Sequence, residues 1–293
     1  MNKDKIKYFL RSCLHFFSPV KCPNCNSHDA TKVDQKYVVT RLFKCKHCHL
    51  QFRHPLDSHN FNSAFYQEEY KQDDGITTDL PSQEELTAMI ATDFSKSSKN
   101  VGNMVNVLTA AVGDIKNVKM VDYGSSWGYM SYQFRKRGML MQSFEISKPR
   151  ASYGNKNLGL DIKSNSDDLT PGNDIFFSSH VIEHVPSIGD MVNISKKLLN
   201  PGGYFIAECP NGSKSFREKN SRAFNLAWGL VHPSYISEDF YQWMFRENPY
   251  LILSSPYDTS LIKEWDQQSQ KTYRTDGDQL FVIARPNVRL KGS

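Results

Sequence analysis

Residues Val118–Gly128 read VKMVDYGSSWG, an apolar run that leads directly into a turn with two glycines. The run ends at Tyr123 and has the length and composition of a buried strand, and a helix is predicted to begin near Trp127. Gly124 would allow the tight turn, and Gly128 would allow the backbone to approach a ligand closely. This order of strand, turn and helix is typical of folds that bind a nucleoside-bearing ligand at a helix N-terminus.

The following hundred or so residues continue this alternation of strand and helix. Further helices are predicted to start near Lys148 and Ile188, and another is predicted upstream, from about Ser98 to Val112. The predicted strands after the first cover residues 140–145, 174–178 and 204–208. Short buried strands that alternate with helices predict an α/β fold, in which helices cover both faces of a parallel sheet.

One acidic residue adds to the prediction of a nucleoside site. Glu145 lies 23 residues after Asp122, at the predicted end of the second strand. From that position its carboxylate could accept hydrogen bonds from both hydroxyls of a ribose. The sequence therefore predicts a ribose-binding carboxylate beside the glycine turn.

Between residues 100 and 285 the chain resembles the class I S-adenosylmethionine-dependent methyltransferases. In that family the first strand ends in an acidic residue before a glycine-rich turn, as at Asp122, Gly124 and Gly128, and the second strand ends in the ribose-binding acid, as at Glu145. Three later stretches also match the family's pattern: Asn173–Val185 with its Glu-His-Val ending, Leu198–Tyr204 with its Pro-Gly-Gly turn, and Asp278–Arg285 as a last strand.

The resemblance implies a Rossmann-like, doubly wound methyltransferase sheet of seven strands and S-adenosyl-L-methionine as the cofactor. Two residues depart from the family's pattern: Ser126 stands where a second glycine is common, and Asn165 stands where an adenine-contacting aspartate is usual. Ser126 is still small enough for the turn, and Asn165 or Asp167 can hydrogen-bond an adenine amino group. The implied cofactor-binding residues are Asp122, Gly124, Ser126, Gly128, Glu145, Asn165, Asp167 and Ser179.

Three histidines are candidates for a catalytic base. Methyl transfer from a sulfonium needs alignment in a dry pocket, and it needs a base only when the acceptor is a hydroxyl or a carbon acid. His180 and His184 follow the fourth strand of the resemblance, at the edge of the sheet where ligands bind in such folds. His232 lies in an aromatic-rich insertion after the fifth strand, a region that usually shapes the acceptor pocket. A structural role for His184 stays open beside the catalytic one.

The cysteines are concentrated near the N-terminus and predict a metal site. Cys22 and Cys25 form one pair with two residues between them, and Cys45 and Cys48 form a second pair 19 residues further on. Two such pairs supply four thiolates to one tetrahedral ion and leave no position for water, which indicates a structural zinc in a zinc-ribbon-like module. A rubredoxin-like iron and redox dithiols are the nearest alternatives.

The segment before this module is predicted to form an amphipathic helix over residues 1–19. Its apolar stripe is formed by Ile6, Phe9, Leu10, Cys13, Leu14 and Phe17. The stripe could dock on the body of the protein, on a partner or on a membrane surface. The predicted organisation is thus a helix at 1–19, the zinc-ribbon-like module at 20–56, a linker and helical lead-in at 57–97, and the methyltransferase domain at 98–293.

Composition limits the classes of function. The chain has 293 residues, 39% of them hydrophobic, and a formal net charge of +5 from 36 basic and 31 acidic side chains. No apolar run approaches the roughly 18 to 20 residues of a membrane span. The clustered cysteines are not those of a secreted disulfide framework, and we expect a cytoplasmic protein. The small basic excess permits a nucleic-acid partner without arguing for one.

Three functional hypotheses follow. The first is an enzyme that methylates a small molecule or a glycan, such as a sugar in surface-polysaccharide biosynthesis, since a zinc module before a methyltransferase core resembles bacterial sugar methyltransferases. The second is an RNA methyltransferase that grips RNA with the zinc ribbon. Residues 178–181, SSHV, lack the Pro-Pro element with which amino-methylating enzymes hold a flipped base. The third is a non-catalytic binding protein on the same fold.

Overall fold

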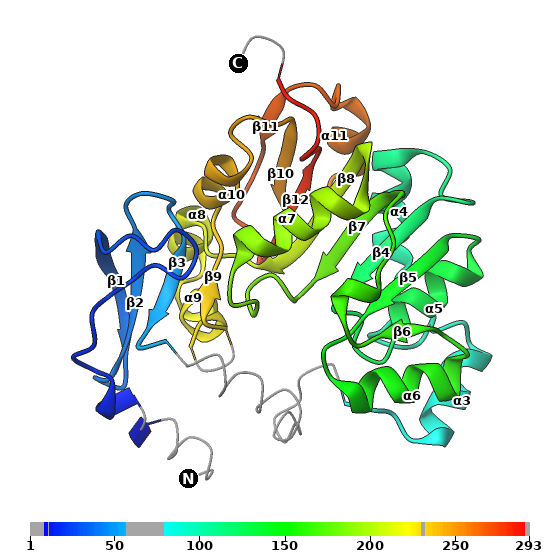
Figure 1. Ribbon diagram of the computed structural model, residues 1–293, viewed down its shortest axis with the longest axis horizontal. Helices are drawn as coiled ribbons and strands as arrows, with labels where there is room; N and C mark the ends of the chain where they lie inside the picture. The colour runs from blue at the N-terminus through cyan, green and yellow to red at the C-terminus, as the bar shows by residue number, and fades with distance from the viewer. Residues whose placement is uncertain (1–8, 11, 57–78, 230–231, 291–293) are drawn as a thin grey trace.

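A computed structural model of the chain describes residues 9–10, 12–56, 79–229 and 232–290 (Figure 1). Much of the predicted N-terminal helix and most of the predicted linker therefore lie outside the described residues. Among the described residues, none of the helices combines the length and the apolar character that a membrane crossing demands.

The larger of two sheets has eight strands in the order β11-β10-β12-β8-β7-β4-β5-β6. Their bounds are β4 Lys119–Tyr123, β5 Leu140–Phe144, β6 Ile162–Lys163, β7 Asn173–Ser179, β8 Leu199–Pro210, β10 Tyr250–Ser254, β11 Gln270–Thr272 and β12 Gln279–Ala284. The five strands from β6 to β8 run parallel, and β12 is antiparallel to both of its neighbours. The predicted Rossmann-like, mostly parallel sheet is confirmed, with the short β11 added at one edge to the seven strands expected.

Helices cover both faces of this sheet, as the alternation of strand and helix predicted (Figure 1). Side chains of α7 (Ile188–Leu198) and α10 (Glu238–Met244) pack on one face, and those of α4 (Gly102–Val112), α5 (Tyr129–Lys136) and α11 (Thr259–Glu264) pack on the other. Within β7, Phe176 faces the first group while Ile175 and Phe177 face the second. Because successive residues of a strand point to opposite faces, such strands read as continuous apolar runs.

The remaining helices have short lengths or lie at the edges of the fold. They are α3 (Gln83–Ala91), α6 (Lys148–Leu158), α8 (Lys214–Lys219), α9 (Ser221–Ala227) and the 3-10 turn η2 (Ser166–Asp168). Ser82 caps α3, and Ser82 and Glu85 exchange two hydrogen bonds of 3.2 and 2.8 Å in a capping box. α6 and α7 begin at the predicted residues, whereas α5 begins two residues after Trp127, because Gly128 takes the cap position in a left-handed conformation.

The smaller sheet joins the cysteine-rich segment to the rest of the chain. It has the order β1-β2-β3-β9, with β1 Ala30–Lys36, β2 Thr40–Cys45, β3 Gln51–His54 and β9 Ser234–Tyr235. β9 comes from the insertion after β8 and pairs antiparallel with β3. The module at 20–56 therefore obtains its fourth strand from a segment almost two hundred residues away in the sequence.

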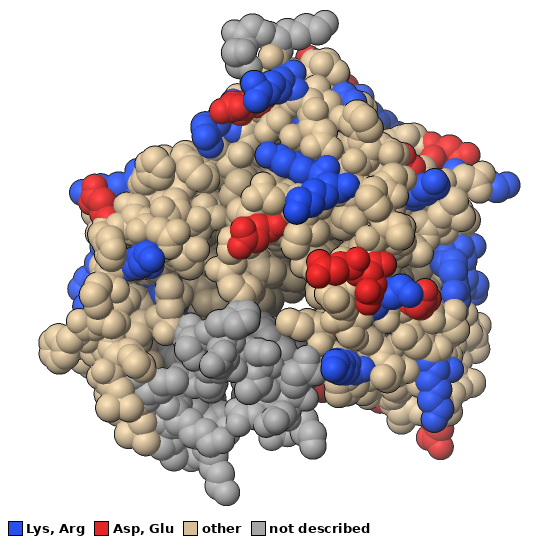
Figure 2. Space-filling view, in the orientation of Figure 1, with Lys and Arg blue, Asp and Glu red and all other residues tan. Residues whose placement is uncertain are grey.

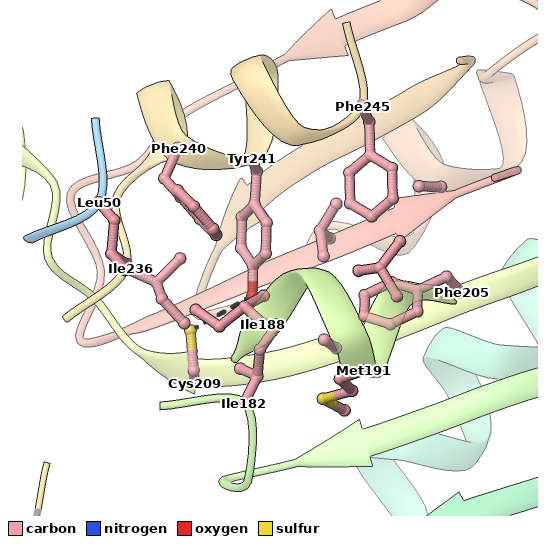
Figure 3. Close-up of a cluster of buried hydrophobic side chains, with 14 of the residues drawn as sticks. Leu50, Ile182, Ile188, Met191, Phe205, Cys209, Ile236, Phe240, Tyr241 and Phe245 are labelled. Carbon is pink, nitrogen blue, oxygen red and sulfur yellow. Dashed lines mark hydrogen bonds between the residues drawn. The ribbon is translucent and has the colours of Figure 1, made fainter. Parts of the chain in front are cut away.

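A shared hydrophobic core connects the two sheets. One buried cluster contains Cys22, Cys45, Cys48 and Leu50 from the module together with residues of β4, β7, β8, α7 and α10. Figure 3 shows Leu50 beside Ile236 and Phe240, with Cys209 hydrogen-bonded to Tyr241 in the same cluster. Burial of apolar area on both sides of this junction stabilises the two parts as one unit.

The described part of the N-terminal stripe does not pack on the body of the protein. Phe9, Leu10, Leu14 and Phe17 expose 44%, 57%, 82% and 92% of their surface, respectively. Phe16 does contact the body, because its ring lies 4.2 Å from the guanidinium of Arg41. Docking on a partner or on a membrane surface stays a prediction for the exposed residues.

Candidate active site

The carboxyl ends of β4, β5 and β7 meet at one edge of the large sheet and border a cavity of about 490 Å³. β4 lies between β7 and β5 in the sheet. The chain continues from β4 to β5 on one side and returns later to β7 on the other side, so the loops after β4 and β7 diverge and leave a crevice between them. Residues that line the cavity include Asp122, Gly124, Ser126, Glu145, Ser179, His180 and His184. The structure thus brings seven of the predicted site residues together.

The turn after β4 is held close to β5 by backbone hydrogen bonds. The amides of Gly124 and Ser125 both donate to the carbonyl oxygen of Phe144, at 2.8 and 2.9 Å. Gly124 has φ +90°, and a Cβ atom there would lie 2.2 Å from Cγ2 of Val181 in the facing loop. Only glycine fits this position, since a side chain would both strain the backbone and fill the crevice.

Ser126 adopts a backbone conformation that explains why glycine is common at this position in the family that the sequence resembles. Its φ is +53°, in the left-handed region that costs a non-glycine residue about 1 kcal/mol or more. Its amide donates to Oε2 of Glu145 at 2.8 Å. The hydroxyl groups of Ser125 and Ser126 are buried at the cavity without a hydrogen-bond partner among the described residues.

Glu145 is fixed by the backbone on both sides. Its Oε1 accepts from the amide of Ser147 and its Oε2 from the amide of Ser126, both at 2.8 Å. Burial raises the pKa of Glu145, and these hydrogen bonds together with the charge of Arg150 oppose that rise. Each carboxylate oxygen can accept a second hydrogen bond, so the side chain can still receive a pair of ligand hydroxyls.

Asp122 lies beneath the turn, almost completely buried. The hydroxyl of Ser131 donates to its Oδ2 at 2.5 Å, and Ser143 donates to Ser131 at 2.9 Å. Burial raises the pKa of Asp122 to about 6, with a further contribution from the nearby Glu145 and opposition from Ser131. The carboxylate is therefore held in an apolar setting where its charge depends on a cation or on donors from the cavity.

The three candidate histidines surround one carboxylate that sequence reasoning did not select. Oε1 of Glu183 lies 3.6 Å from Nδ1 of His180, 3.8 Å from Nε2 of His184 and 4.0 Å from Nε2 of His232. His180 and His184 line the cavity, and the ring of His232 lies against that of His184, with 4.8 Å between the ring centres. Burial alone would raise the pKa of Glu183, but the three histidines hold it at about 2.

The one signal for Glu183 in the sequence was its place before His184 in the Glu-His-Val element. His180 has a pKa above its ordinary value, because Glu183 outweighs the opposing effect of burial. Its φ of +55° is a left-handed backbone conformation directly after the end of β7. Other cavity residues missed from the sequence are Tyr129, Met130, Ile146, Arg150, Asp190 and Met191. Ile146 and Arg150 follow the second strand directly, which is the signal that could have found them.

Three predicted cofactor residues lie away from the cavity lining. Gly128 has φ +80°, and a Cβ atom there would lie 2.3 Å from Cδ1 of Leu160 and 2.9 Å from Cδ1 of Ile162. It therefore permits close packing of the turn on the segment before and within β6, rather than a close approach to the cavity. Asn165 caps η2, where its side chain accepts from the amide of Asp167 at 3.2 Å.

The four cysteines converge as the spacing predicted. Their sulfur atoms all lie within 4.8 Å of one another, and the pairs Cys22–Cys48 and Cys25–Cys45 are 3.5 Å apart. A tetrahedral zinc with bonds of about 2.3 Å needs sulfur separations of about 3.8 Å, so the set fits a zinc ion. The hydrogen bond between Cys22 and Cys48 lowers the pKa of the Cys22 thiol to about 5 and raises that of Cys48, so the two sulfur atoms share one proton that a bound metal would displace.

The chain matches no protein-family model and no curated protein sequence. Solved structures with a similar fold are S-adenosylmethionine-dependent methyltransferases. One from Mesorhizobium loti is 14% identical, with a TM-score of 0.45, over 64% of this chain and 99% of its own. The plantazolicin methyltransferase BpumL is 9% identical, with a TM-score of 0.48, over 76% and 95%. The geranyl diphosphate C-methyltransferase from Streptomyces coelicolor A3(2) is 17% identical, with a TM-score of 0.43, over 77% and 96%. At these identities the likeness is one of fold.

Proposed function

We propose that the protein is an S-adenosyl-L-methionine-dependent methyltransferase whose acceptor is a small molecule or a glycan, such as a sugar in surface-polysaccharide biosynthesis. The observation that carries this proposal is the cavity at the switch point of the sheet. On one side it has the glycine turn and the backbone-held Glu145, and on the other it has His180 and His184. A nucleoside can lie along the first side while an acceptor reaches the second.

The residues of the first side fit the cofactor. Gly124 provides a surface without a side chain, and the unpaired hydroxyl groups of Ser125 and Ser126 are available as donors or acceptors. Glu145 would accept the ribose hydroxyls, and Asp122 would face the positively charged part of the cofactor. We keep Ser179 in this set as a cavity residue, whereas Gly128, Asn165 and Asp167 would act only through the backbone segments that they shape.

The cofactor would supply an electrophilic methyl group on a sulfonium. The side chains of the protein would position the acceptor and take a proton from it. The cavity would hold the acceptor in line with the methyl group, and such alignment accounts for much of the acceleration in displacements of this kind. For a hydroxyl acceptor a base must take one proton, and His180 and His184 are placed at the cavity wall for this. The ring of His232 contacts the ring of His184, so His232 would influence proton transfer only through His184.

The basic side chains near the module favour a small acceptor over RNA. Lys44 pairs with Asp239, and Lys46 pairs with Asp29 at 2.8 Å. On the face that Figure 2 shows, basic and acidic side chains of the described residues are interspersed. The part of the module visible on this face has no continuous basic patch among the described residues. Sequence-independent binding of a nucleic acid depends on a row of unpaired cations, which release counterions on binding.

We further propose that Cys22, Cys25, Cys45 and Cys48 hold a structural zinc ion. All four positions of a tetrahedral ion would be occupied by thiolates, so the site would stabilise the fold and take no part in the chemistry. A four-thiolate site also suits a reducing compartment, and we place the protein in the cytoplasm for that reason.

The cofactor proposal is tested by calorimetric titration of the full chain with S-adenosylhomocysteine. We expect one site per chain, and we expect Glu145→Ala to weaken binding by at least about 10- to 100-fold, since each hydrogen bond to a charged group contributes about 1.5 to 3 kcal/mol. Glu218→Ala, at an exposed position far from the cavity, should bind as the unchanged protein does. Absence of binding to the unchanged protein would refute the proposal.

The acceptor class is tested by transfer of a radiolabelled methyl group into a cell lysate. We expect the label in the small-molecule or glycan fraction. Label in RNA would support the RNA methyltransferase instead, and cofactor binding without any label would favour a non-catalytic binding protein. His180→Asn and His184→Asn separate proton transfer from binding, because loss of a base lowers kcat and leaves the affinity for S-adenosylhomocysteine unchanged.

A further inference from the structure

A second group of metal-binding side chains lies behind the cavity, distinct from the four cysteines. Glu183, His184 and His232 each offer one ligand atom, and these three atoms lie within 4.8 Å of one another. Oε1 of Glu183 is 3.8 Å from Nε2 of His184 and 4.0 Å from Nε2 of His232. At these distances the groups are too far apart to hydrogen-bond and close enough to share an ion.

The carboxylate at the centre of this group has imidazole rings as its charged neighbours, at 3.6 to 4.0 Å. Glu183 exposes 1% of its surface, and neither of its oxygen atoms has a hydrogen-bond partner among the described residues. An imidazole balances this charge only when it carries a second proton, and a metal ion shared with neutral imidazoles would balance it without one. Buried charges are usually paired or bound to a metal. The position therefore calls for a cation next to Oε1.

The hydrogen bonding of His232 points its free nitrogen towards the same place. Nδ1 of His232 lies 2.5 Å from the carbonyl oxygen of Ala227. A carbonyl oxygen only accepts, so Nδ1 carries a hydrogen, and Nε2 is the ring nitrogen that faces Glu183. A hydrogen bond from the far ring nitrogen to a carbonyl is the arrangement that orients histidines for metal binding.

The backbone around the cluster fixes the relative position of its members. The amide of Ser234 donates to the carbonyl oxygen of Glu183 at 3.2 Å, and the amide of Arg53 in β3 donates to that of Pro233 at 2.8 Å. The cysteine-rich module therefore holds the segment that carries His232 against the loop that carries Glu183. A site held on several sides is preorganised for a ligand.

We propose that Glu183, His184 and His232 bind a divalent transition-metal ion of the zinc type. Two imidazoles and one carboxylate suit such ions, whereas Mg²⁺ prefers oxygen ligands alone. Tetrahedral bonds of about 2.1 Å place ligand atoms about 3.4 Å apart. The two distances from Glu183 would shorten by about half an ångström, and the two histidine nitrogens would close from a separation of at most 4.8 Å.

Three protein ligands would leave one position of the ion open, and His184, one of the three, lines the cavity. With His184 bound to the ion, the base named above would be His180. An acceptor hydroxyl bound at the open position would lose its proton more readily. This role rests on the proposed methyl transfer, whereas the metal binding itself does not.

The test is a count of metal ions in the full chain. After chelator treatment and dialysis, the protein is titrated with Co²⁺, and bound metal is measured by mass spectrometry alongside the visible spectrum. We expect two equivalents: one with the intense thiolate-to-cobalt absorption of the four-cysteine site, and one with only weak absorption bands. Zn²⁺ should displace both, and an equal concentration of Mg²⁺ should displace neither.

The variants identify the second site. Glu183→Gln and His232→Asn should each lose the weakly absorbing equivalent and keep the thiolate one, which also reports that the module is folded. Glu208→Gln removes another carboxylate near the same edge of the sheet and should keep both equivalents. Uptake of a single equivalent by the unchanged protein, or retention of two by His232→Asn, would overturn the proposal. S-Adenosylhomocysteine titration of the same samples reports the cofactor site separately.

Discussion

At the level of single residues, the site places two carboxylates in buried positions at the ends of adjacent strands. Glu145 accepts hydrogen bonds from two backbone amides, whereas the side chain of Asp122 accepts, among the residues that the structure describes, from the hydroxyl of Ser131. Burial of the charged carboxylate therefore costs more free energy at Asp122 than at Glu145. Backbone donors that the fold already supplies stabilise the charged form, and burial without them stabilises the neutral form.

We expect Asp122→Asn to stabilise the protein in a pH-dependent way. The pKa of Asp122 is about 6 in the folded chain against 3.8 for the free side chain, so the unfolded chain loses this proton first and stability falls as pH rises between these values. The asparagine should add up to about 3 kcal/mol at pH 7.5 and clearly less at pH 4.5. Urea unfolding at both pH values measures this. The exposed Asp161→Asn should change stability by less than about 0.5 kcal/mol.

We expect Ser126→Gly to stabilise the turn. Glycine adopts the φ of +53° without strain and keeps the amide that donates to Glu145, so a gain of about 0.5 to 1 kcal/mol in the free energy of unfolding should result. The neighbouring Ser125→Gly is the control, because Ser125 is not in the left-handed region and should lose about 0.5 to 1 kcal/mol. Equal effects of both changes in thermal unfolding would contradict the strain argument.

At the level of elements, the turn between β4 and α5 and the loop after β7 enclose the cavity from two sides. Each element was predicted from a local pattern: the apolar run of β4, the glycine after it, and the strand before His180. Their packing was not, because the contact of Gly124 with Val181 joins residues 57 positions apart. The resemblance implied cofactor binding for both glycines of the turn, and the structure places Gly124, but not Gly128, at the cavity.

Gly124→Ala should abolish binding of S-adenosylhomocysteine, since the new Cβ atom would push Val181 into the cavity. Gly138→Ala is a matched control: its φ is +89° against +90°, and its Cβ atom would meet only Lys116, away from the cavity. Both changes should lower stability by about 1 to 2 kcal/mol through backbone strain. Calorimetry should show lost binding for Gly124→Ala alone. Similar affinities for the two variants would remove the turn from the proposed cofactor site.

At the level of the whole molecule, the cysteine-rich module and the large sheet form one structural unit. They share a hydrophobic cluster, and β9 of the insertion completes the small sheet of the module. The same pairing holds the segment that carries His232. We therefore expect a substitution of a cysteine in the module to lower the stability of the residues near the cavity as well.

We expect Cys45→Ser to destabilise the whole chain by more than about 4 kcal/mol, because loss of a structural metal removes folding free energy and exposes the shared core. Thermal unfolding should show one transition at a much lower Tm. Cys13→Ser, at an exposed cysteine outside the cluster, should leave the Tm unchanged. A second transition at the original Tm would show instead that the large sheet folds independently of the module.

The sequence by itself determined many of the elements and the chemistry of the ligands that lie close together along the chain. The strands β4, β5, β7, β8 and β12, the starts of α6 and α7, the glycine turn, Glu145 and the two cysteine pairs follow from local composition and spacing, since these depend on neighbours within a few residues. The short strands β6, β9, β10 and β11 and the helices α8 to α11 were not predicted. The tertiary structure alone decided that Glu183 meets three histidines, that Gly128 packs on Leu160, and that β9 joins β3. Contacts between segments distant in sequence arise from packing of the complete core, and no local pattern encodes them.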